Sequence, residues 1–245
     1  MNLIIDIGNT RAKIAVFQQD KLLEKKIATH KNILVTVQKV IQEFPLIEFA
    51  ILSSVDIFTK KEEIALKKLV KLVVLTNNVK IPFQNTYTTP KTLGVDRIAL
   101  ITAAVMQYPD KNVLVMDAGT CITYDFLNTK NEYLGGAISL GLTSRYEALH
   151  NITAKLPLLK PNNPDFFIGN STENSIHSGV VNGLLHEIDG VINDYMLNYS
   201  KLTVILTGGD TVFLSKRLKS SIFAKPNFLL EGLNYILEIN KNLND

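Results

Sequence analysis

The start of the chain alternates short apolar runs with tight polar turns. Each run is rich in aliphatic residues and is bounded by turn-forming residues, which is the pattern of a strand. Strands are therefore predicted over residues 2–6, 13–17 and 22–28. The first turn, between Asp6 and Lys13, contains a glycine that allows a tight backbone conformation.

Further along, helical spacing of apolar residues alternates with short buried runs. Helices are predicted over residues 32–44, 58–72, 98–107, 142–149, 175–195 and 228–239. Strands are predicted over residues 47–52, 73–75, 113–116, 122–126, 133–138 and 202–206. The segment 155–169 contains three prolines and is predicted to be a loop. The lysines of the helix predicted over 58–72 are expected to form a solvated face, with Glu63 four residues before Lys67, and the alternative is a basic docking face.

The pattern of the first hairpin recurs at mid-chain. Asp117-Ala118-Gly119-Thr120 stands between two apolar runs, as Asp6-Ile7-Gly8-Asn9-Thr10 does at the start. Strand and helix patterns follow each copy in a similar order. The sequence therefore predicts an α/β fold of two lobes facing each other across a cleft, residues 1–111 and 112–245, with the last helix packing back on the first lobe.

The two turns predict a phosphate site. An Asp at the end of a buried strand is a carboxylate at the rim of a core, and it can hold a hydrated divalent cation. Backbone N–H groups and threonine hydroxyls in the turn can donate to anionic oxygens. Together these groups are typical of a nucleotide phosphate site. The alternative is two ordinary hairpins whose turns contain Asp and Gly, and the repetition makes this alternative weaker.

Composition limits the class of protein. The 245 residues are 46% hydrophobic and 20% charged, as in a globular protein with a normal core. No apolar run approaches the roughly 18 residues of a membrane span, and no signal segment opens the chain. The net charge of +3 does not favour nucleic acid. Cys121 is the only cysteine, which fits a cytoplasmic location, and it is predicted to be a small buried residue.

Several common sites are excluded by their motifs. The chain has no Gly-x-x-x-x-Gly-Lys-[Ser/Thr] loop, no Gly-x-Gly-x-x-Gly after the first strand, and no Cys/His cluster with zinc spacing. The four histidines are scattered, and each is predicted to be a surface or packing residue: His30, His150, His177 and His186.

With these motifs in their order, the chain resembles the acetate and sugar kinase/Hsp70/actin superfamily, whose lobes are ribonuclease-H-like (actin-like ATPase) with a mixed sheet each. A late Thr207-Gly208-Gly209-Asp210 resembles its adenosine motif. Gly94-Val95-Asp96-Arg97 resembles the pantothenate motif of the type III pantothenate kinase family. The resemblance continues through Gly135-Gly136-Ala137-Ile138, Thr153-Ala154-Lys155-Leu156-Pro157 and Asn170-Ser171-Thr172.

This resemblance implies ATP-dependent phosphorylation of pantothenate to 4'-phosphopantothenate, the first step of coenzyme A biosynthesis. It implies magnesium near Asp6 and a potassium or ammonium ion on Asp117. The residues implied to bind ATP are Asp6, Ile7, Gly8, Asn9, Thr10, Arg11, Ala12, Lys13 and Thr120.

The resemblance also implies the substrate site. Asp96 matches the general base, and a carboxylate can take an alcohol's proton late in phosphoryl transfer. Thr172 matches a residue that closes the pantothenate pocket at a homodimer interface. The residues implied to bind pantothenate are Tyr87, Gly94, Val95, Asp96, Arg97 and Thr172. The chain departs from the family's pattern at Leu140, where proline is usual, and a softer loop is expected there.

Each site residue has a structural alternative. Asp96-Arg97 could be a helix cap with a surface salt bridge, Asp117 a turn residue, Thr172 a helix N-cap, and Tyr87 a cover over the core. Two other functions stay open on the same fold. One is a transcriptional accessory protein without catalysis, and the other is a sugar kinase or a polyphosphate-cleaving phosphatase.

Overall fold

The structure, a computed structural model, describes residues 1–54 and 58–241. The chain divides into two compact units. The first contains residues 1–109 and 131–133 and the helix that begins at residue 228. The second contains residues 110–130 and 134–227. Each unit is built on its own mixed sheet.

The first sheet has the strand order β3-β2-β1-β4-β5. Its strands are β1 (Asn2–Ile7), β2 (Ala12–Gln18), β3 (Lys21–Ala28), β4 (Phe49–Ser54) and β5 (Lys71–Val74). The three strands at the start of the chain are antiparallel, whereas β4 and β5 run parallel to β1. The helices α1 (Ile33–Glu43) and α2 (Lys60–Lys67) connect the parallel strands. All three strands predicted at the start of the chain are thereby confirmed.

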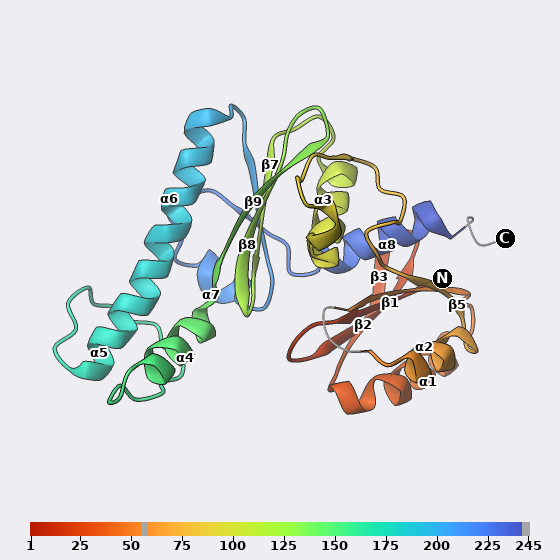
Figure 1. The fold of residues 1–245 in the computed structure, drawn as a ribbon, viewed down its shortest axis with the longest axis horizontal. Coiled ribbons are helices and arrows are strands. Elements are labelled where there is room, and N and C mark those ends of the chain that lie inside the picture. The colour runs from red at the N-terminus through yellow and green to blue at the C-terminus, as the bar shows by residue number, and fades with distance from the viewer. Residues whose placement is uncertain (55–57, 242–245) are drawn as a thin grey trace. The chain divides into compact units, whose positions relative to one another are not determined.

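Strand β1 is buried along its whole length because both faces of the sheet are covered. Leu3 and Ile5 pack with residues of α1 and α2 such as Val37 and Leu66. Helix α8 (Phe228–Asn240) packs against β1 and β4, on the side opposite α1 and α2 (Figure 1). The Asn2 side-chain amide donates to Asn234 Oδ1 of α8 over 2.8 Å. Helices on both faces explain why this central strand is a continuous apolar run rather than an alternating one.

The second sheet repeats the first. Its strands are β7 (Val113–Ala118), β8 (Cys121–Leu127), β9 (Glu132–Leu140), β10 (Thr203–Thr207) and β11 (Phe223–Ala224), in the order β11-β10-β7-β8-β9. As in the first sheet, the initial hairpin is antiparallel and the later strands run parallel to its first strand. The short β6 (Gln84–Asn85) pairs with the first residues of β9, which belong to the first unit. The predicted repetition of a mixed sheet is confirmed.

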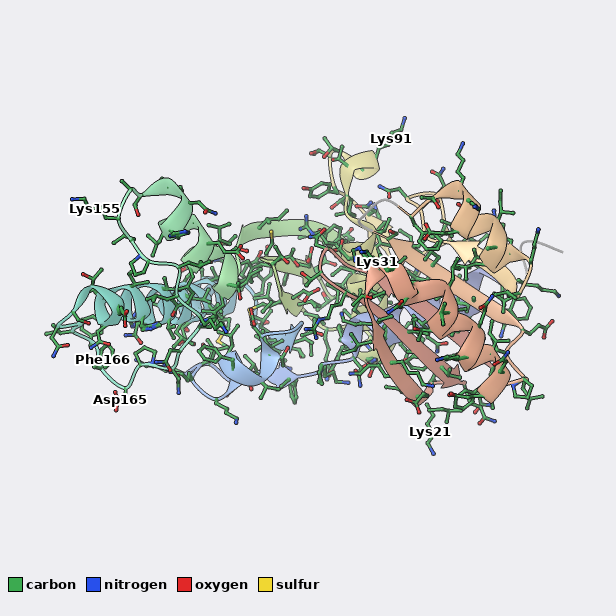
Figure 2. The ribbon with its side chains drawn as sticks, turned by 90° about the horizontal axis from the view of Figure 1, so that it is seen from below. Lys21, Lys31, Lys91, Lys155, Asp165 and Phe166 are labelled. Atoms are coloured by element: carbon green, nitrogen blue, oxygen red, sulfur yellow. The ribbon has the colours of Figure 1, made fainter. Side chains whose placement is uncertain are left out.

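The helices of the second unit are α4 (Leu142–Ile152), α5 (Thr172–His177), α6 (Gly183–Asn198) and α7 (Thr211–Ser215). One helix was predicted over residues 175–195, but a π-helical segment at 178–182 joins α5 to α6. There, Ser178 Oγ donates to the Phe167 carbonyl, and the Asn182 amide donates to the Phe166 carbonyl over 3.2 Å. The π-helical turn thus carries two side chains that fasten the preceding loop, on which Figure 2 labels Asp165 and Phe166.

The predicted end of one helix and the predicted burial of Cys121 were wrong. The helix predicted to reach residue 72 ends at Lys67, because residues 71–74 pair with β4 as a parallel strand. Its start has a capping box between Thr59 and Glu62, and the expected Glu63–Lys67 ion pair is present at 2.6 Å. Cys121 is exposed instead of buried, because it begins β8 and its neighbour Ile122 takes the inward-facing position. No helix within residues 1–54 or 58–241 is long and apolar enough to cross a membrane.

Helix α3 (Val95–Gln107) is buried from Arg97 to Val105, and α8 packs against it at Gly232. A Cβ at Gly232 would lie 1.9 Å from the Ala99 carbonyl oxygen. Gly232→Ala therefore forces two helix backbones apart, and we expect it to lower the free energy of unfolding by about 1–3 kcal/mol. Urea unfolding followed by circular dichroism measures the change.

The matched control is Gly190→Ala, in the middle of α6. A Cβ there meets no atom within 4 Å. Alanine favours a helix over glycine by about 1 kcal/mol, so this variant should be as stable as wild type or more stable. Equal stability of the two variants would mean that α3 and α8 do not pack as closely as described.

Candidate active site

The first acidic turn joins β1 to β2 in the first unit. The Gly8 N–H donates to the Arg11 carbonyl over 3.2 Å and closes the turn. Asn9, Thr10 and Arg11 are exposed, whereas Ala12 is buried where β2 begins. The turn therefore presents its backbone and its hydroxyl at the surface, as a site for anionic oxygens requires.

Asp6 is buried at the end of β1, beside this turn, and only 6% of it is exposed. Burial raises the pKa of its carboxyl group. Lys13 Nζ, 3.3 Å from Asp6 Oδ2, opposes this rise, and the charge of Asp96 adds to it. Ser53 lies beside Asp6 on β4, and its buried hydroxyl has no hydrogen-bond partner among the described residues. A buried carboxylate held at such an electrostatic cost fits a residue that meets a cation, and magnesium bound there would favour the ionised form.

Asp96 stands in the first turn of α3, near enough to Asp6 for the charges to interact. Its Oδ1 accepts a hydrogen bond from the Arg97 backbone N–H over 2.9 Å. A Cβ on Gly94 would lie 2.4 Å from the same Oδ1. Glycine at this position therefore leaves the space that the Asp96 carboxylate occupies.

Arg97 is buried, with 5% of its surface exposed, so a surface salt bridge does not describe it. Its guanidinium lies 5.6 Å from the ring centre of Tyr87 and 5.9 Å from that of Tyr133. The two tyrosine rings stack with centres 6.1 Å apart and planes inclined by 25°. Cation–π contact with two rings restrains the guanidinium. Tyr87 follows β6 in the loop that leads to Lys91, whose side chain projects away from the ribbon in Figure 2.

The second acidic turn belongs to the second unit. Asp117 lies near the end of β7, and Thr120 is exposed in the turn before β8. Gly208 follows β10 with φ +95°, and a Cβ there would lie 2.4 Å from Asp117 Oδ1 and 2.3 Å from the Ala118 carbonyl oxygen. The Asp210 N–H donates to that carbonyl over 3.0 Å, and burial raises the pKa of the Asp210 carboxyl group.

The glycine turn after β10 is therefore packed directly against the Asp117 carboxylate. Only a residue without a side chain allows this approach at positive φ. The carboxylate and carbonyl oxygens of Asp117 and Ala118 are donors of the kind that hard cations take. Asp117 therefore has the chemistry to hold a cation, and this role stays a prediction.

A groove of about 790 Å³ lies elsewhere in the second unit. Thr172 lines it and is the first residue of α5, and Ser171 is the N-cap, whose Oγ accepts from the Asn174 N–H over 3.1 Å. The interpretation of Thr172 as an N-cap is therefore wrong. The groove is otherwise mostly apolar, and it is lined by Leu140, Arg145, Ala148, Leu149, Ile152, Thr153, Leu156, Thr172, Ser175, Ile176, Gly179 and Val180.

Leu140, where the family usually has proline, is the last residue of β9. Its carbonyl accepts a hydrogen bond from Arg145 Nε over 2.9 Å, and Arg145 also pairs with Glu187 of α6. The next residue, Gly141, donates its N–H to the Thr120 carbonyl over 3.0 Å. The Thr120 turn and the groove containing Thr172 are therefore linked through Leu140 and Gly141.

The predicted residues fall into two groups. The first unit brings together Asp6, the turn at 7–13, Tyr87 and the segment 94–97. The second unit contains Asp117, Thr120 and Thr172. Sequence reasoning missed Tyr133, since a tyrosine inside a strand gives no local signal of its contact with Arg97. It also missed His30, whose Nε2 lies 2.9 Å from the Gly8 carbonyl oxygen.

The two mixed sheets have the same strand order, and each has an acidic glycine turn after its first strand, which is the architecture of the actin-like ATPase fold. A ROK family glucokinase from Streptomyces griseus, solved with glucose and AMPPNP, is similar over 98% of this chain and 99% of its own, with a TM-score of 0.55 at 11% identity. A Campylobacter jejuni protein described as a Baf family transcriptional activator has a TM-score of 0.64 at 23% identity, over 98% and 99% of the two chains. At these identities both likenesses concern the fold alone.

Sequence similarity identifies the family within this class. The family model for type III pantothenate kinase matches residues 2–194. A type III pantothenate kinase from Christiangramia forsetii is 53% identical over 241 residues, which cover 98% of this chain and 99% of that relative. The chain belongs to the type III pantothenate kinase family.

Proposed function

We propose that this chain transfers the γ-phosphoryl group of ATP to the primary hydroxyl of pantothenate, giving 4'-phosphopantothenate and ADP. The family and its relatives support the reaction. The observation that supports the proposed assignment of residues is that Asp96 and Asp6 belong to one unit and are near enough for their charges to interact.

In the proposed reaction, the acceptor oxygen attacks the γ-phosphorus, and the bond from phosphorus to the bridging oxygen of ADP breaks. The Asp96 carboxylate accepts the hydroxyl proton as the new O–P bond forms. The guanidinium of Arg97, which lies 5.6 Å from the ring centre of Tyr87 and 5.9 Å from that of Tyr133, is proposed to pair with the pantothenate carboxylate. The turn of residues 7–13 is the proposed phosphate-binding segment of the first unit, and Thr120 of the second unit is a further proposed ATP contact.

The cations have separate proposed sites. Magnesium bound to the nucleotide would be held near Asp6, where it neutralises charge on the transferred phosphoryl group. Asp117 would hold a monovalent cation, potassium or ammonium, and the Ala118 carbonyl oxygen would be a second ligand. The reaction belongs to central metabolism, and we place the protein in the cytoplasm.

An ADP-release assay tests this function. Wild type should turn over with pantothenate, ATP, magnesium and potassium, and it should be slower when sodium replaces potassium. Glucose and N-acetylmannosamine should give no turnover. Activity on a sugar with none on pantothenate would support the sugar-kinase alternative. A transcriptional role without catalysis is not favoured, since relatives at high identity carry the kinase name.

We also propose a homodimer formed over the groove that contains Thr172. The groove is largely apolar and large, and Ile152 at its edge is 83% exposed. An apolar surface of this kind marks an interaction site more often than free surface. A second copy covering it would shield Thr172 and complete the pantothenate pocket.

Ile152→Glu should therefore convert the dimer to a monomer in analytical ultracentrifugation. It should also raise the KM for pantothenate about tenfold or more while changing the KM for ATP little, because a charge buried in an apolar interface without a partner is costly. Leu197→Glu is the control, since Leu197 is 85% exposed on α6 but does not line the groove. A dimeric Ile152→Glu variant would contradict this interface.

A further inference from the structure

His30 connects the third strand of the chain to the phosphate turn. The antiparallel pairing of β2 with β3 places Ala28 opposite Ala12, so the end of β3 lies beside the residue that follows the turn. The chain then enters a short 3-10 helix, η1 (His30–Asn32), which begins with His30. Lys21 and Lys31, labelled in Figure 2, mark the two ends of this part of the chain.

The imidazole meets one particular peptide group of the turn. His30 Nε2 lies 2.9 Å from the Gly8 carbonyl oxygen. A carbonyl oxygen only accepts, so Nε2 carries the proton and donates. Both the neutral Nε2–H tautomer and the imidazolium have this proton, so the contact does not depend on the charge of the ring. The imidazole is half-buried.

This contact fixes the direction of a donor on the opposite side of the same peptide. The Gly8 carbonyl and the Asn9 N–H belong to one planar peptide group, and no described peptide bond is cis. In a trans peptide the two groups point in opposite directions. With the carbonyl directed at His30, the Asn9 N–H is directed away from His30.

The other side of Gly8 is also restrained, since its own N–H donates to the Arg11 carbonyl over 3.2 Å. Glycine at this position would otherwise allow the peptide group between Gly8 and Asn9 to rotate at little cost. Rotation of this peptide group would exchange the positions of its N–H and its carbonyl, and a carbonyl oxygen repels an anion. His30 is the side chain that opposes this exchange.

We infer that His30 is a positioning residue for ATP, which orients the Asn9 N–H toward the phosphates by holding the Gly8 carbonyl. The inference rests on the proposed function of the turn as the phosphate site. It predicts a specific defect in nucleotide binding when the imidazole is removed, because the donor then samples both orientations of the peptide.

The test compares His30→Ala with His30→Gln. Glutamine can place an amide N–H near the position of Nε2, whereas alanine leaves the carbonyl without this donor. We expect His30→Ala to raise the KM for ATP about two- to tenfold, the effect of one hydrogen bond. The KM for pantothenate should change less than twofold, and His30→Gln should recover most of the loss.

His150→Ala is the matched control. His150 Nδ1 also contacts a backbone carbonyl, that of Leu156, at 2.8 Å, but in the second unit. The His150→Ala substitution should leave the KM for ATP unchanged. The thermal midpoint of each variant is measured alongside, because a merely structural role would lower stability and affect both substrates equally.

Nuclear magnetic resonance of the protein without ligands gives an independent measurement. The Asn9 amide resonance should shift or broaden in His30→Ala and return toward its wild-type position in His30→Gln. An unchanged KM for ATP in a folded His30→Ala variant, or equal defects in the alanine and glutamine variants, would overturn the inference. Calorimetry of magnesium-ATP binding distinguishes failure of this inference from failure of the proposed reaction. If wild type binds ATP but does not phosphorylate pantothenate, the proposed reaction is overturned, and the His30 inference is still tested by the ATP affinities of the variants.

Discussion

Asp96→Asn should lower kcat by about 10²–10⁴ while the protein folds normally. Asparagine has nearly the same shape, and its side-chain oxygen can still accept from the Arg97 N–H as Asp96 Oδ1 does. It cannot accept the hydroxyl proton, and the loss of one positioned acid–base group has an effect of this size. The ADP-release assay at saturating substrates measures kcat, and the KM for ATP should stay within about threefold.

A second effect distinguishes this prediction from general damage to the site. The charge of Asp96 contributes to the raised pKa of Asp6, so its removal should lower the pKa of the Asp6 carboxyl group. Carbon-13 resonances of the side-chain carboxyls follow that titration. Asp20→Asn, in the exposed turn before β3, is the control and should change neither quantity. An Asp96→Asn variant with kcat within tenfold of wild type would remove the general-base assignment.

Asp6→Asn should reduce kcat/KM for ATP by about 10²–10³ and yet stabilise the fold. The loss of activity follows from removing a preorganised charge beside the transferred phosphate and its cation. The gain in stability follows from the burial of Asp6, because burial is the largest influence on the pKa of this carboxyl group and makes its charged form unfavourable. We expect the free energy of unfolding at neutral pH to rise by about 0.5–2 kcal/mol, the range typical of substitutions that relieve a functional site.

The pH dependence of this gain has a definite sign. The pKa of Asp6 is higher in the folded protein than its ordinary value of 3.8, so the folded state holds the proton more tightly than the unfolded chain. Stability is therefore lost as the pH rises from that ordinary value through the folded pKa. Asparagine does not titrate, so the stability difference between variant and wild type should grow across this window and then stay constant. Urea unfolding at a series of pH values measures it, and a less stable variant at neutral pH would contradict the prediction.

These predictions differ in what they require of the structure. Those for Asp6 and Asp96 depend on two carboxylates that lie in one unit. The prediction for His30 depends on a single contact to the backbone of the turn. The prediction for Ile152 depends on a surface of the second unit. Together their outcomes test the phosphate turn, the acceptor site and the assembly.

Local patterns were sufficient for most strands and helices. The run before Asp6 and the run before Asp117 each predict a strand, because an unbroken aliphatic segment that ends at a glycine turn has few other stable arrangements. The same signals located the acidic turns, and the family's motifs located Asp96 and Arg97. Such features depend on residues that are neighbours in sequence, so they can be predicted without knowing the contacts between distant segments.

Contacts between distant segments decided the rest. Lys67 ends its helix because the residues that follow complete a sheet, and Cys121 faces outward because Ile122 takes the core. Tyr133 reaches Arg97, and His30 reaches Gly8, only through strand pairings that join segments far apart in sequence. The sequence identifies the side chains that could take part in catalysis and binding. The electrostatic cost of Asp6 and the direction of a single peptide group depend on what folding places around them.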